Sequence, residues 1–266
     1  TNMFYFDEID GKKVMKSDMI EANHFFTTRE TIIKTKEKNF EPLVEENKKS
    51  VCKYFHISKE NLISPQQTHT SNIEICKIGK SDYPDTDGLI LTNPNQAIFL
   101  NFADCTPVLF YDKVLKIGAV SHAGWRGTAG RIAPKTAQKM IELGSKPENI
   151  SVAIGAAISM CCYNVGEEVF KKLKATVNDF SGLSEFRNGE TFVNLKEINA
   201  RQLQEFGIKN IDICPYCTSC NNDLFFSYRK ENATTNRHSA VLFTIRPFFK
   251  TNYTSYFTKK LVSRFA

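Results

Sequence analysis

The stretch Asn101-Phe-Ala-Asp-Cys-Thr-Pro-Val-Leu-Phe110 is followed at close range by Val120-Ser-His-Ala-Gly-Trp-Arg-Gly127. Each stretch joins an apolar run that is long enough for a β-strand to polar residues of the types found at reactive centres. This shared order predicts that Cys105 and His122 lie at the ends of neighbouring strands. Core packing alone rarely requires a thiol, an imidazole, a guanidinium and a glycine-rich turn so close together. The sequence therefore places the chemistry of the protein in this part of the chain.

Further apolar and β-branched runs predict a protein with many strands. We expect strands at 88–91, 97–102, 107–111, 116–121, 150–155, 208–213, 224–228 and 239–245. Helical patterns lie among them, and we expect helices at 41–55, 128–143, 166–177 and 194–206. The last begins after Asn194 as N-cap, with Glu197 three residues on as in a capping box. Many strands with helices distributed among them indicate an α+β fold with mixed sheets.

Length and composition are those of an ordinary globular protein. The chain has 266 residues, of which 41% are hydrophobic and 24% are charged, and this is enough to form one large core. We find no internal repeat and no low-complexity tract in the sequence. We therefore expect residues 1–266 to form a single domain.

Charge and hydropathy argue against two classes of partner. The net charge of +6 comes from basic residues scattered among acids, whereas a nucleic-acid footprint is expected to be a basic stripe with interleaved aromatics. No stretch reaches the roughly 18 apolar residues that a membrane span needs, and the N-terminus lacks the pattern of a signal peptide. We therefore expect a cytoplasmic protein that binds neither nucleic acid nor membranes. A monomer of this size needs no partner to be stable, although the sequence leaves the oligomeric state open.

The eight cysteines are dilute in a chain of this length, and the sequence shows no secretory signal. Free thiols or metal ligands are therefore favoured over disulfides. Cys214, Cys217 and Cys220 form one group, and the only further cysteines nearby in sequence are Cys161 and Cys162. Because the adjacency of that pair is awkward for tetrahedral geometry, we interpret the group as structural thiols. Metal binding or redox chemistry is the alternative.

His69, in Gln66-Gln-Thr-His-Thr70, is a third candidate for the site. Together with Cys105 and His122 it supplies one thiolate and two imidazoles. These are donor types that Zn²⁺ prefers, and three of them leave a fourth position open, as in catalytic zinc sites. A metal-free cysteine hydrolase, with Cys105 as nucleophile and His122 as base, is an alternative, and a small buried thiol is the simplest interpretation.

The turn after His122 has the features of an anion site. Its glycines allow close backbone approach, Arg126 adds a guanidinium, and the unpaired N–H groups at the start of the following helix suit phosphate. Asp104, next to Cys105, is a candidate acid/base group or a partner of the metal ligands.

Taken together, these residues resemble the laccase-domain or YfiH-like family, first described as multicopper polyphenol oxidases and later as zinc-dependent purine nucleoside enzymes. The matching segments run in family order across most of the chain: His24-Phe-Phe-Thr-Thr-Arg29, Gln67-Thr-His69, Thr86-Asp-Gly-Leu-Ile90, Ala103-Asp-Cys-Thr-Pro107, His122-Ala-Gly-Trp-Arg-Gly127, Ile154-Gly155 with Cys161-Cys-Tyr-Asn-Val-Gly166, and Phe226-Ser-Tyr-Arg229. The pairing of the Ala-Asp-Cys-x-Pro and His-Ala-Gly-Trp-Arg-Gly segments is highly specific.

The resemblance implies that His69, Cys105 and His122 bind the catalytic zinc, and that mixed sheets form a sandwich flanked by helices. It also implies phosphorolysis of adenosine, inosine, guanosine and methylthioadenosine, with phosphate as co-substrate, and deamination of adenosine. From the residues themselves, and not from the resemblance, we expect Asp104 and Arg126 to be catalytic. The residues expected to contact the substrates are Arg29, Gln67, Gly127 and Arg229.

The sequence departs from the family pattern at positions that concern substrate preference. The glycine-rich stretch usual after the Thr-Thr-Arg motif is replaced by residues 30–40, and the usual Tyr-Glu-Val reads Tyr163-Asn164-Val165. The usual Gly-Pro reads Gly155-Ala156, and the usual Gly-Arg near the end reads Asn236-Arg237. The aromatic tail 248–266 extends past the usual end of the family and is a candidate C-terminal extension. The three ligand residues are unchanged.

The older family name suggests a copper-binding polyphenol oxidase as the alternative activity. A multicopper oxidase of the usual kind needs more histidines for its copper centres than the five of this chain. Cu²⁺ can nevertheless occupy the zinc site, because it has the higher affinity for such donors.

Overall fold

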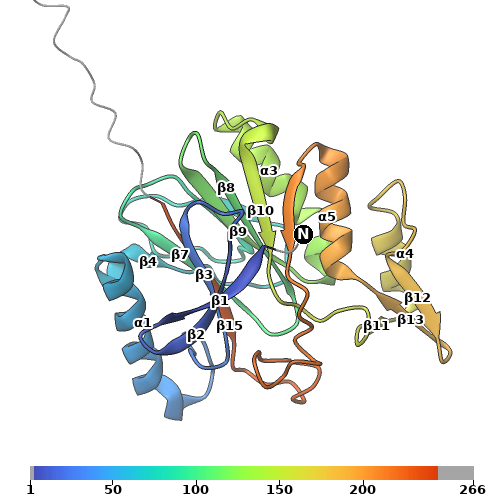
Figure 1. The fold of residues 1–266 in the computed structure, drawn as a ribbon, viewed down its shortest axis with the longest axis horizontal. Coiled ribbons are helices and arrows are strands. Elements are labelled where there is room, and N and C mark those ends of the chain that lie inside the picture. The colour runs from blue at the N-terminus through green and yellow to red at the C-terminus, as the bar shows by residue number, and fades with distance from the viewer. Residues whose placement is uncertain (1–2, 245–266) are drawn as a thin grey trace, which may run out of the picture.

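Two six-stranded sheets pack face to face, and helices cover their outer faces, in a computed structural model that describes residues 3–244 (Figure 1). The first sheet contains, in spatial order, β1 (Phe4–Ile9), β2 (Lys12–Ser17), β3 (Asn23–Thr27), β15 (His238–Phe243), β7 (Ala97–Phe102) and β4 (Leu62–Ile63). The second contains β14 (Asn210–Ile213), β10 (Ile150–Ile154), β8 (Thr106–Asp112), β9 (Ile117–Ala123), β6 (Gly88–Leu91) and β5 (Ile73–Ile75). Both sheets are mixed, because β4, β5 and β14 each pair in parallel with a neighbour whereas the other pairs are antiparallel.

Five α-helices and a small third sheet complete the described part of the chain. The helices are α1 (Glu41–Phe55), α2 (Trp125–Ala129), α3 (Ile132–Glu142), α4 (Glu167–Lys174) and α5 (Leu195–Phe206). The third sheet consists of β11 (Asn164–Val165), β13 (Glu190–Val193) and β12 (Ser184–Arg187), and it lies with α4 at one side of the sandwich (Figure 1). Short 3₁₀ turns occur at Lys38–Phe40, Lys59–Asn61 and Pro147–Asn149.

Every residue of β7, β8, β9 and β15 is buried, which explains why these strands read as nearly continuous apolar runs. Between the sheets lie side chains from both, among them Phe26, Leu100, Leu242, Leu89, Leu109 and Val120. On the outer face of the second sheet, α3 and α5 contribute Ile132, Met140 and Leu203. On the outer face of the first, α1 contributes Val51 and Phe55. The predicted α+β sandwich flanked by helices is therefore confirmed.

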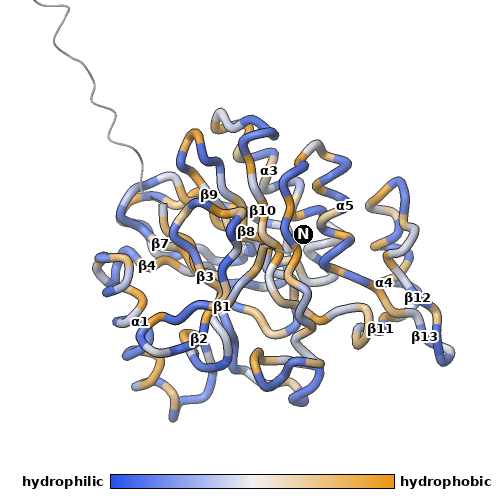
Figure 2. The backbone as a smooth tube through the Cα atoms, in the orientation of Figure 1, coloured by the Kyte–Doolittle hydropathy of each residue, from blue (hydrophilic) through white to orange (hydrophobic). Residues whose placement is uncertain are grey.

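Hydropathy along the backbone follows this layering. Hydrophobic residues concentrate in the central strands, whereas the turn between β12 and β13 at the edge of the molecule is hydrophilic (Figure 2). Between residues 3 and 244, none of the helices combines the length and the hydrophobicity that crossing a bilayer requires.

Two predicted elements are wrong. The helix predicted at 128–143 is divided into α2 and α3, because Arg131 adopts a left-handed conformation with φ of 60°. Pro134 consequently falls in the first turn of α3, where proline is tolerated. The strand predicted at 224–228 is a series of turns, since the N–H groups of Leu224 and Phe225 both donate to the nearby Asn221 carbonyl, at 3.0 and 3.1 Å.

Several other predicted elements are found at or near their expected bounds. Those of β6, β7 and α1 coincide with the prediction, and α5 has the expected N-cap, in which the Asn194 side chain accepts the N–H of Glu197 at 3.2 Å. The candidate extension 248–266 lies outside the described residues.

Candidate functional site

Cys105 and His122 lie close together at the same end of two adjacent central strands of the second sheet. The strands β8 and β9 are antiparallel neighbours in which Thr106 lies opposite Ala123 and Pro107 lies opposite His122. Cys105 directly precedes β8, and His122 is the last residue but one of β9. The predicted placement of both residues at the ends of neighbouring strands is therefore confirmed.

His69 reaches the same place from the loop between β4 and β5. One ligand atom from each of His69, Cys105 and His122 lies within 4.8 Å of the others. The two imidazole rings are 4.9 Å apart between centroids and tilted by 71°. His122 is buried, Cys105 is half-buried and His69 is exposed, so the group opens to solvent on the side of His69. Three donors of these types form a possible metal site.

The buried carboxylate of Asp87 organises this group. Its Oδ1 lies 2.8 Å from Nδ1 of His122, which leaves the other ring nitrogen of His122 for the group at the centre of the site. The same carboxylate accepts the backbone N–H groups of Thr68, His69 and Thr70 at 3.2, 3.1 and 2.8 Å, as well as the Thr70 hydroxyl. His69 has a φ of 65°, a conformation that non-glycine residues adopt only when their surroundings hold them there. A single acid therefore positions two of the three candidate ligands.

Charge couples the members of the group. Burial acts to raise the pKa of the Cys105 thiol. The charge and hydrogen bonds of His122 and His69 outweigh this effect and bring the pKa to about 6, below its usual value. Burial lowers the pKa of His122, but the Cys105 thiolate and Asp87 raise it to about 9. Burial also opposes ionisation of Asp87, yet hydrogen bonds from His122 and Thr70 bring its pKa to about 2. The protein groups by themselves therefore favour a thiolate next to a protonated imidazole, whose proton a metal ion would displace.

Two glycines of the turn after His122 make room for the group. A Cβ atom on Gly124 would lie 3.0 Å from the Cys105 sulfur and 3.4 Å from a carbon of the His69 ring. One on Gly127 would lie 3.1 Å from the carbonyl oxygen of His122 and 3.3 Å from that of Thr70. Both positions are close approaches of backbone to the segments that carry the candidate ligands.

Comparison with known proteins places this geometry in a family. The sequence model of the family described as multi-copper polyphenol oxidoreductase laccase matches residues 32–244. The chain belongs to this family. It is 34% identical over 219 residues to the purine nucleoside phosphorylase YlmD of Geobacillus stearothermophilus, covering 75% of this chain and 78% of the relative. It is 31% identical over 195 residues to the adenosine deaminase RL5 of an unknown prokaryotic organism, covering 68% and 74%. These names and the family together identify the chain as an enzyme.

Two solved structures share the fold of this chain. The crystal structure of YlmD from Geobacillus stearothermophilus superimposes with a TM-score of 0.82 at 28% identity, covering 92% of this chain and 99% of that one. The crystal structure of the hypothetical protein YfiH from Bacillus licheniformis gives 0.81 at 29% identity, with coverages of 90% and 98%.

Both oxygens of the Asp104 carboxylate accept hydrogen bonds from residues late in the chain, Thr218 and Arg229. Oδ1 accepts the Thr218 hydroxyl at 2.7 Å, and Oδ2 accepts the backbone N–H of Arg229 at 2.7 Å. The residue is buried and has a φ of 92°. These contacts support a role in positioning the adjacent Cys105, while the catalytic role stays a prediction.

The side chains of Arg29 and Gln67, both predicted to contact substrate, bind other residues of the same chain. The Arg29 guanidinium donates to the carbonyls of Asn222 and Phe225, forms an ion pair with Glu231 at 3.0 Å and stacks on the Phe226 ring. Both ends of the Gln67 amide bind the Asn101 backbone, each at 2.8 Å. These contacts indicate that both side chains support the loops around the site.

Arg126 and Arg229 are exposed residues that both act electrostatically on Tyr163, and the Arg229 guanidinium also donates to the side chain and carbonyl of Asn164. Arg126 lies over the Trp125 ring at 4.4 Å, and Arg229 lies over the Tyr163 ring at 5.3 Å. Burial and the Cys105 thiolate raise the pKa of Tyr163 to about 12, whereas both arginines oppose this shift. The phenol is therefore a neutral hydrogen-bond donor that acts electrostatically with Cys105 and with two cations.

The predicted anion site at the turn needs one correction. The N–H of Thr128, the first after Gly127, donates to the Gly124 carbonyl at 2.8 Å inside α2, so it is not free for phosphate. The cause is the earlier helix start, at Trp125 instead of residue 128. A contact of Gly127 itself with substrate stays a prediction.

Sequence reasoning missed Asp87 and Tyr163 as residues of the site. Both lie within segments that carry the family resemblance, but neither was assigned a role. The signal for Asp87 was an acid directly before the fully buried strand β6, where an unpaired charge is costly. The signal for Tyr163 was weaker, because a tyrosine after two cysteines is as readily a packing residue.

Proposed function

We propose that the protein is a zinc-dependent purine nucleoside phosphorylase that also deaminates adenosine. Its substrates would be adenosine, inosine, guanosine and methylthioadenosine, with phosphate as the second substrate. The observation that carries the proposal is the convergence of His69, Cys105 and His122, with Asp87 hydrogen-bonded to the outer nitrogen of His122. A carboxylate that orients a ligating histidine in this way is a common feature of zinc sites.

The donor set fits zinc chemically. One sulfur and two ring nitrogens within 4.8 Å of one another suit a tetrahedral ion that keeps one position for substrate or water. Zinc bound there would supply a Lewis acid that makes water acidic enough to serve as a nucleophile near neutral pH, as the attack on C6 of adenine requires. The names of the two relatives, one a phosphorylase and one a deaminase, support both activities.

Side chains around the metal group would bind the second substrate and move the proton. The exposed guanidinium groups of Arg126 and Arg229 are suited to hold phosphate by paired hydrogen bonds. Tyr163, whose high pKa keeps it protonated, would donate a hydrogen bond or a proton to the departing purine. Asp104, through its bonds to Thr218 and Arg229, would keep Cys105 and the phosphate-binding arginine in register.

A metal-free cysteine hydrolase is the second candidate, and one observation favours it. The order Asp87, His122, Cys105 places an acid, an imidazole and a thiolate in hydrogen-bonding sequence, as in cysteine hydrolases.

A copper oxidase of the multicopper type has less support. Of the other histidines, His24 and His238 are buried, and each has a ring nitrogen bonded to the protein backbone.

The test measures metal content and reaction products of the same preparation. Zinc per chain is determined on the purified protein, and adenosine or inosine is then incubated with and without phosphate. We expect free base and ribose 1-phosphate only with phosphate, and inosine from adenosine under both conditions. Cys52→Ser, a thiol on α1, serves as a control with unchanged products. The proposal fails if zinc is absent, nucleosides stay unchanged and alkylation of Cys105 abolishes a hydrolase activity.

A further inference from the structure

A second group of four cysteines forms where two parallel strands end. The strands β10 and β14 are parallel neighbours, so the chain leaves both at the same edge of the sheet. Pairing continues beyond them, since Ala157 bridges to Cys217 and the N–H of Thr218 donates to the Ala157 carbonyl at 3.1 Å. This brings the segment that contains Cys161 and Cys162 next to the Cys217-Thr-Ser-Cys220 segment.

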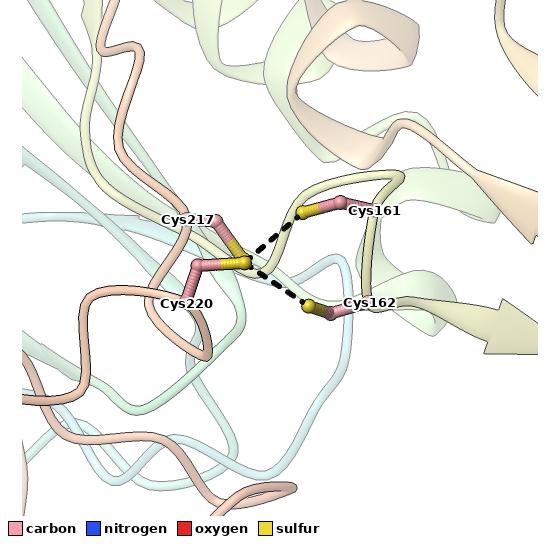
Figure 3. A group of neighbouring side chains, drawn as sticks. All are labelled: Cys161, Cys162, Cys217 and Cys220. Atoms are coloured by element: carbon pink, nitrogen blue, oxygen red, sulfur yellow. Dashed lines mark hydrogen bonds between the residues drawn. The ribbon is translucent and has the colours of Figure 1, made fainter.

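The four sulfur atoms point toward one another (Figure 3). All lie within 4.8 Å of each other, and the Cys220 sulfur is 3.5 Å from that of Cys161 and 3.4 Å from that of Cys162. Four thiolates around one zinc ion, each about 2.3 Å from it, lie about 3.8 Å apart, whereas a disulfide needs about 2.05 Å. The spacing therefore suits a tetrahedral ion.

A tight turn resolves the geometric difficulty of two adjacent cysteines. The N–H groups of Cys162 and Tyr163 both donate to the Ser159 carbonyl, at 2.9 and 3.0 Å. The turn directs both thiols to the same side of the chain, facing Cys220 (Figure 3). Cys214, which was grouped with Cys217 and Cys220 from the sequence, is instead buried 4.0 Å from the sulfur of Met15 and is outside the group.

One sulfur atom of the group accepts a hydrogen bond from the backbone. The N–H of Ser159 donates to the Cys217 sulfur at 3.3 Å. Thiolates that accept backbone N–H groups are stabilised in the form that binds metals.

Two cations lie on the backbone of the same segments. The buried ammonium of Lys196 donates to the carbonyls of Cys214 and Tyr216 at 2.8 and 3.0 Å and interacts electrostatically with Cys217. Arg187 donates to the carbonyls of Met160 and Cys161. Four thiolates and one divalent cation carry a net charge of −2, which these two groups offset.

We propose that Cys161, Cys162, Cys217 and Cys220 bind a second zinc ion in a closed, structural site. All four positions of the ion are filled by sulfur, so no position is left for substrate. The two segments it joins both hold Asp104: the N–H of Ile158 donates to its carbonyl at 2.9 Å, and the Thr218 hydroxyl to its carboxylate at 2.7 Å. The site would therefore stiffen the peptide next to Cys105. This inference does not depend on the proposed nucleoside chemistry.

The test counts zinc ions per chain in the full-length protein, purified with a phosphine reductant and without chelators. Wild type is expected to hold two, and Cys220→Ser one. Cys220 is exposed, so the substitution leaves the core intact. Cys214→Ala, in the same segment but outside the group, is the matched control and keeps two. Reconstitution with Co²⁺ provides a second readout, because the intense charge-transfer bands of an all-thiolate site disappear in Cys220→Ser and persist in Cys105→Ala.

The outcomes separate this site from the one proposed for catalysis. If wild type and Cys220→Ser both hold one zinc, the four-cysteine site is wrong and the His69, Cys105 and His122 site stands. If wild type holds one zinc and Cys220→Ser holds none, the four-cysteine site stands and the His69, Cys105 and His122 site is wrong. In a parallel preparation without reductant, a mass two hydrogens lower with no second metal shows a disulfide and overturns the proposal. Should Cys220→Ser not fold, native mass spectrometry of wild type gives the zinc count directly.

Discussion

The two sulfur-containing groups of this enzyme are built in different ways. Cys105 and His122 stand at the ends of paired, buried strands, and Asp87 holds His122 and the loop of His69. The four-cysteine group stands on turns and loops, and backbone N–H groups and two cations surround it. With one zinc ion bound to each, as proposed, the first would mix nitrogen and sulfur ligands and leave a ligand position open, whereas the second would be all sulfur and closed. The comparison teaches that the number and type of ligands, more than the presence of thiols, separates a reactive site from a structural one.

Replacing the central thiol of each group should give the largest contrast. We expect Cys105→Ala to lose the metal at its site and to lower both phosphorolysis and deamination by at least about 10³-fold, because the Lewis acid is lost. Cys220→Ser should keep most of both activities. Steady-state rates and metal content of the two variants check this. Full metal occupancy at the first site in Cys105→Ala would remove Cys105 from the ligand set.

Acid should lower the folding stability through two buried histidines outside the site, His24 and His238. Burial lowers the pKa of His24 to about 4 and of His238 to about 3, so both are neutral in the folded protein and protonate more readily when it unfolds. The stability that comes from keeping them neutral is fully present above the unfolded pKa of about 6.5. It is lost as the pH falls from there toward the folded pKa of each histidine. For His24 the loss by pH 4 is up to roughly 3 kcal/mol.

Urea unfolding between pH 7 and pH 4 measures this loss. His24→Gln keeps an acceptor for the Ser17 N–H and a donor for the Ala22 carbonyl without titrating, so its unfolding free energy should vary less with pH than that of wild type. Equal slopes for the two proteins would show that His24 does not contribute.

Asp87→Asn tests whether one carboxylate organises the first group. We expect metal affinity to fall by about 10–100-fold, as for other groups that orient a ligating histidine. The second group should be unaffected, because Asp87 makes none of its contacts. Competition with a chromogenic zinc chelator measures both affinities in one titration. An unchanged affinity at the first site would mean that Asp87 serves the fold alone.

The smallest effect should come from the proposed phosphate site. Arg229→Ala keeps the backbone N–H that binds Asp104 and removes the side chain beyond Cβ, including the guanidinium that bonds Asn164, so the KM for phosphate should rise about tenfold, equivalent to about 1.4 kcal/mol. Deamination of adenosine, which needs no phosphate, should be unchanged. Arg201→Ala, on α5, is a control with an unchanged KM. A loss of deamination in Arg229→Ala would instead indicate a damaged fold.

Local patterns in the sequence were enough for the strands that carry the site. The bounds of β6 and β7 and the placement of Cys105 and His122 followed from apolar runs that end in polar residues. His69 was chosen by its donor type, and its convergence with the other two depends on contacts that spacing does not encode.

What the sequence did not predict depends on partners far along the chain. Asp87 pairs with His122 across 35 positions, and a lone acid before a strand does not reveal that partner. The aromatic run 224–228 has the composition of a strand, but it forms turns whose Leu224 and Phe225 carbonyls accept hydrogen bonds from Arg29, far away along the chain. The adjacency of Cys161 and Cys162 argued against a shared ion until the turn at Ser159 placed both thiols on one side.

The position of β15 bears on the order in which the enzyme is made. This strand is formed by nearly the last of the described residues, yet it lies in the middle of the first sheet, between β3 and β7. On the ribosome, β7 therefore lacks one of its neighbours until residues 238–243 have emerged. Because pairing over such long separations is slow, the peptide after β7, which carries Cys105, is ordered late. A nascent chain would thus complete the proposed metal site of His69, Cys105 and His122 only after residues 238–243 have emerged.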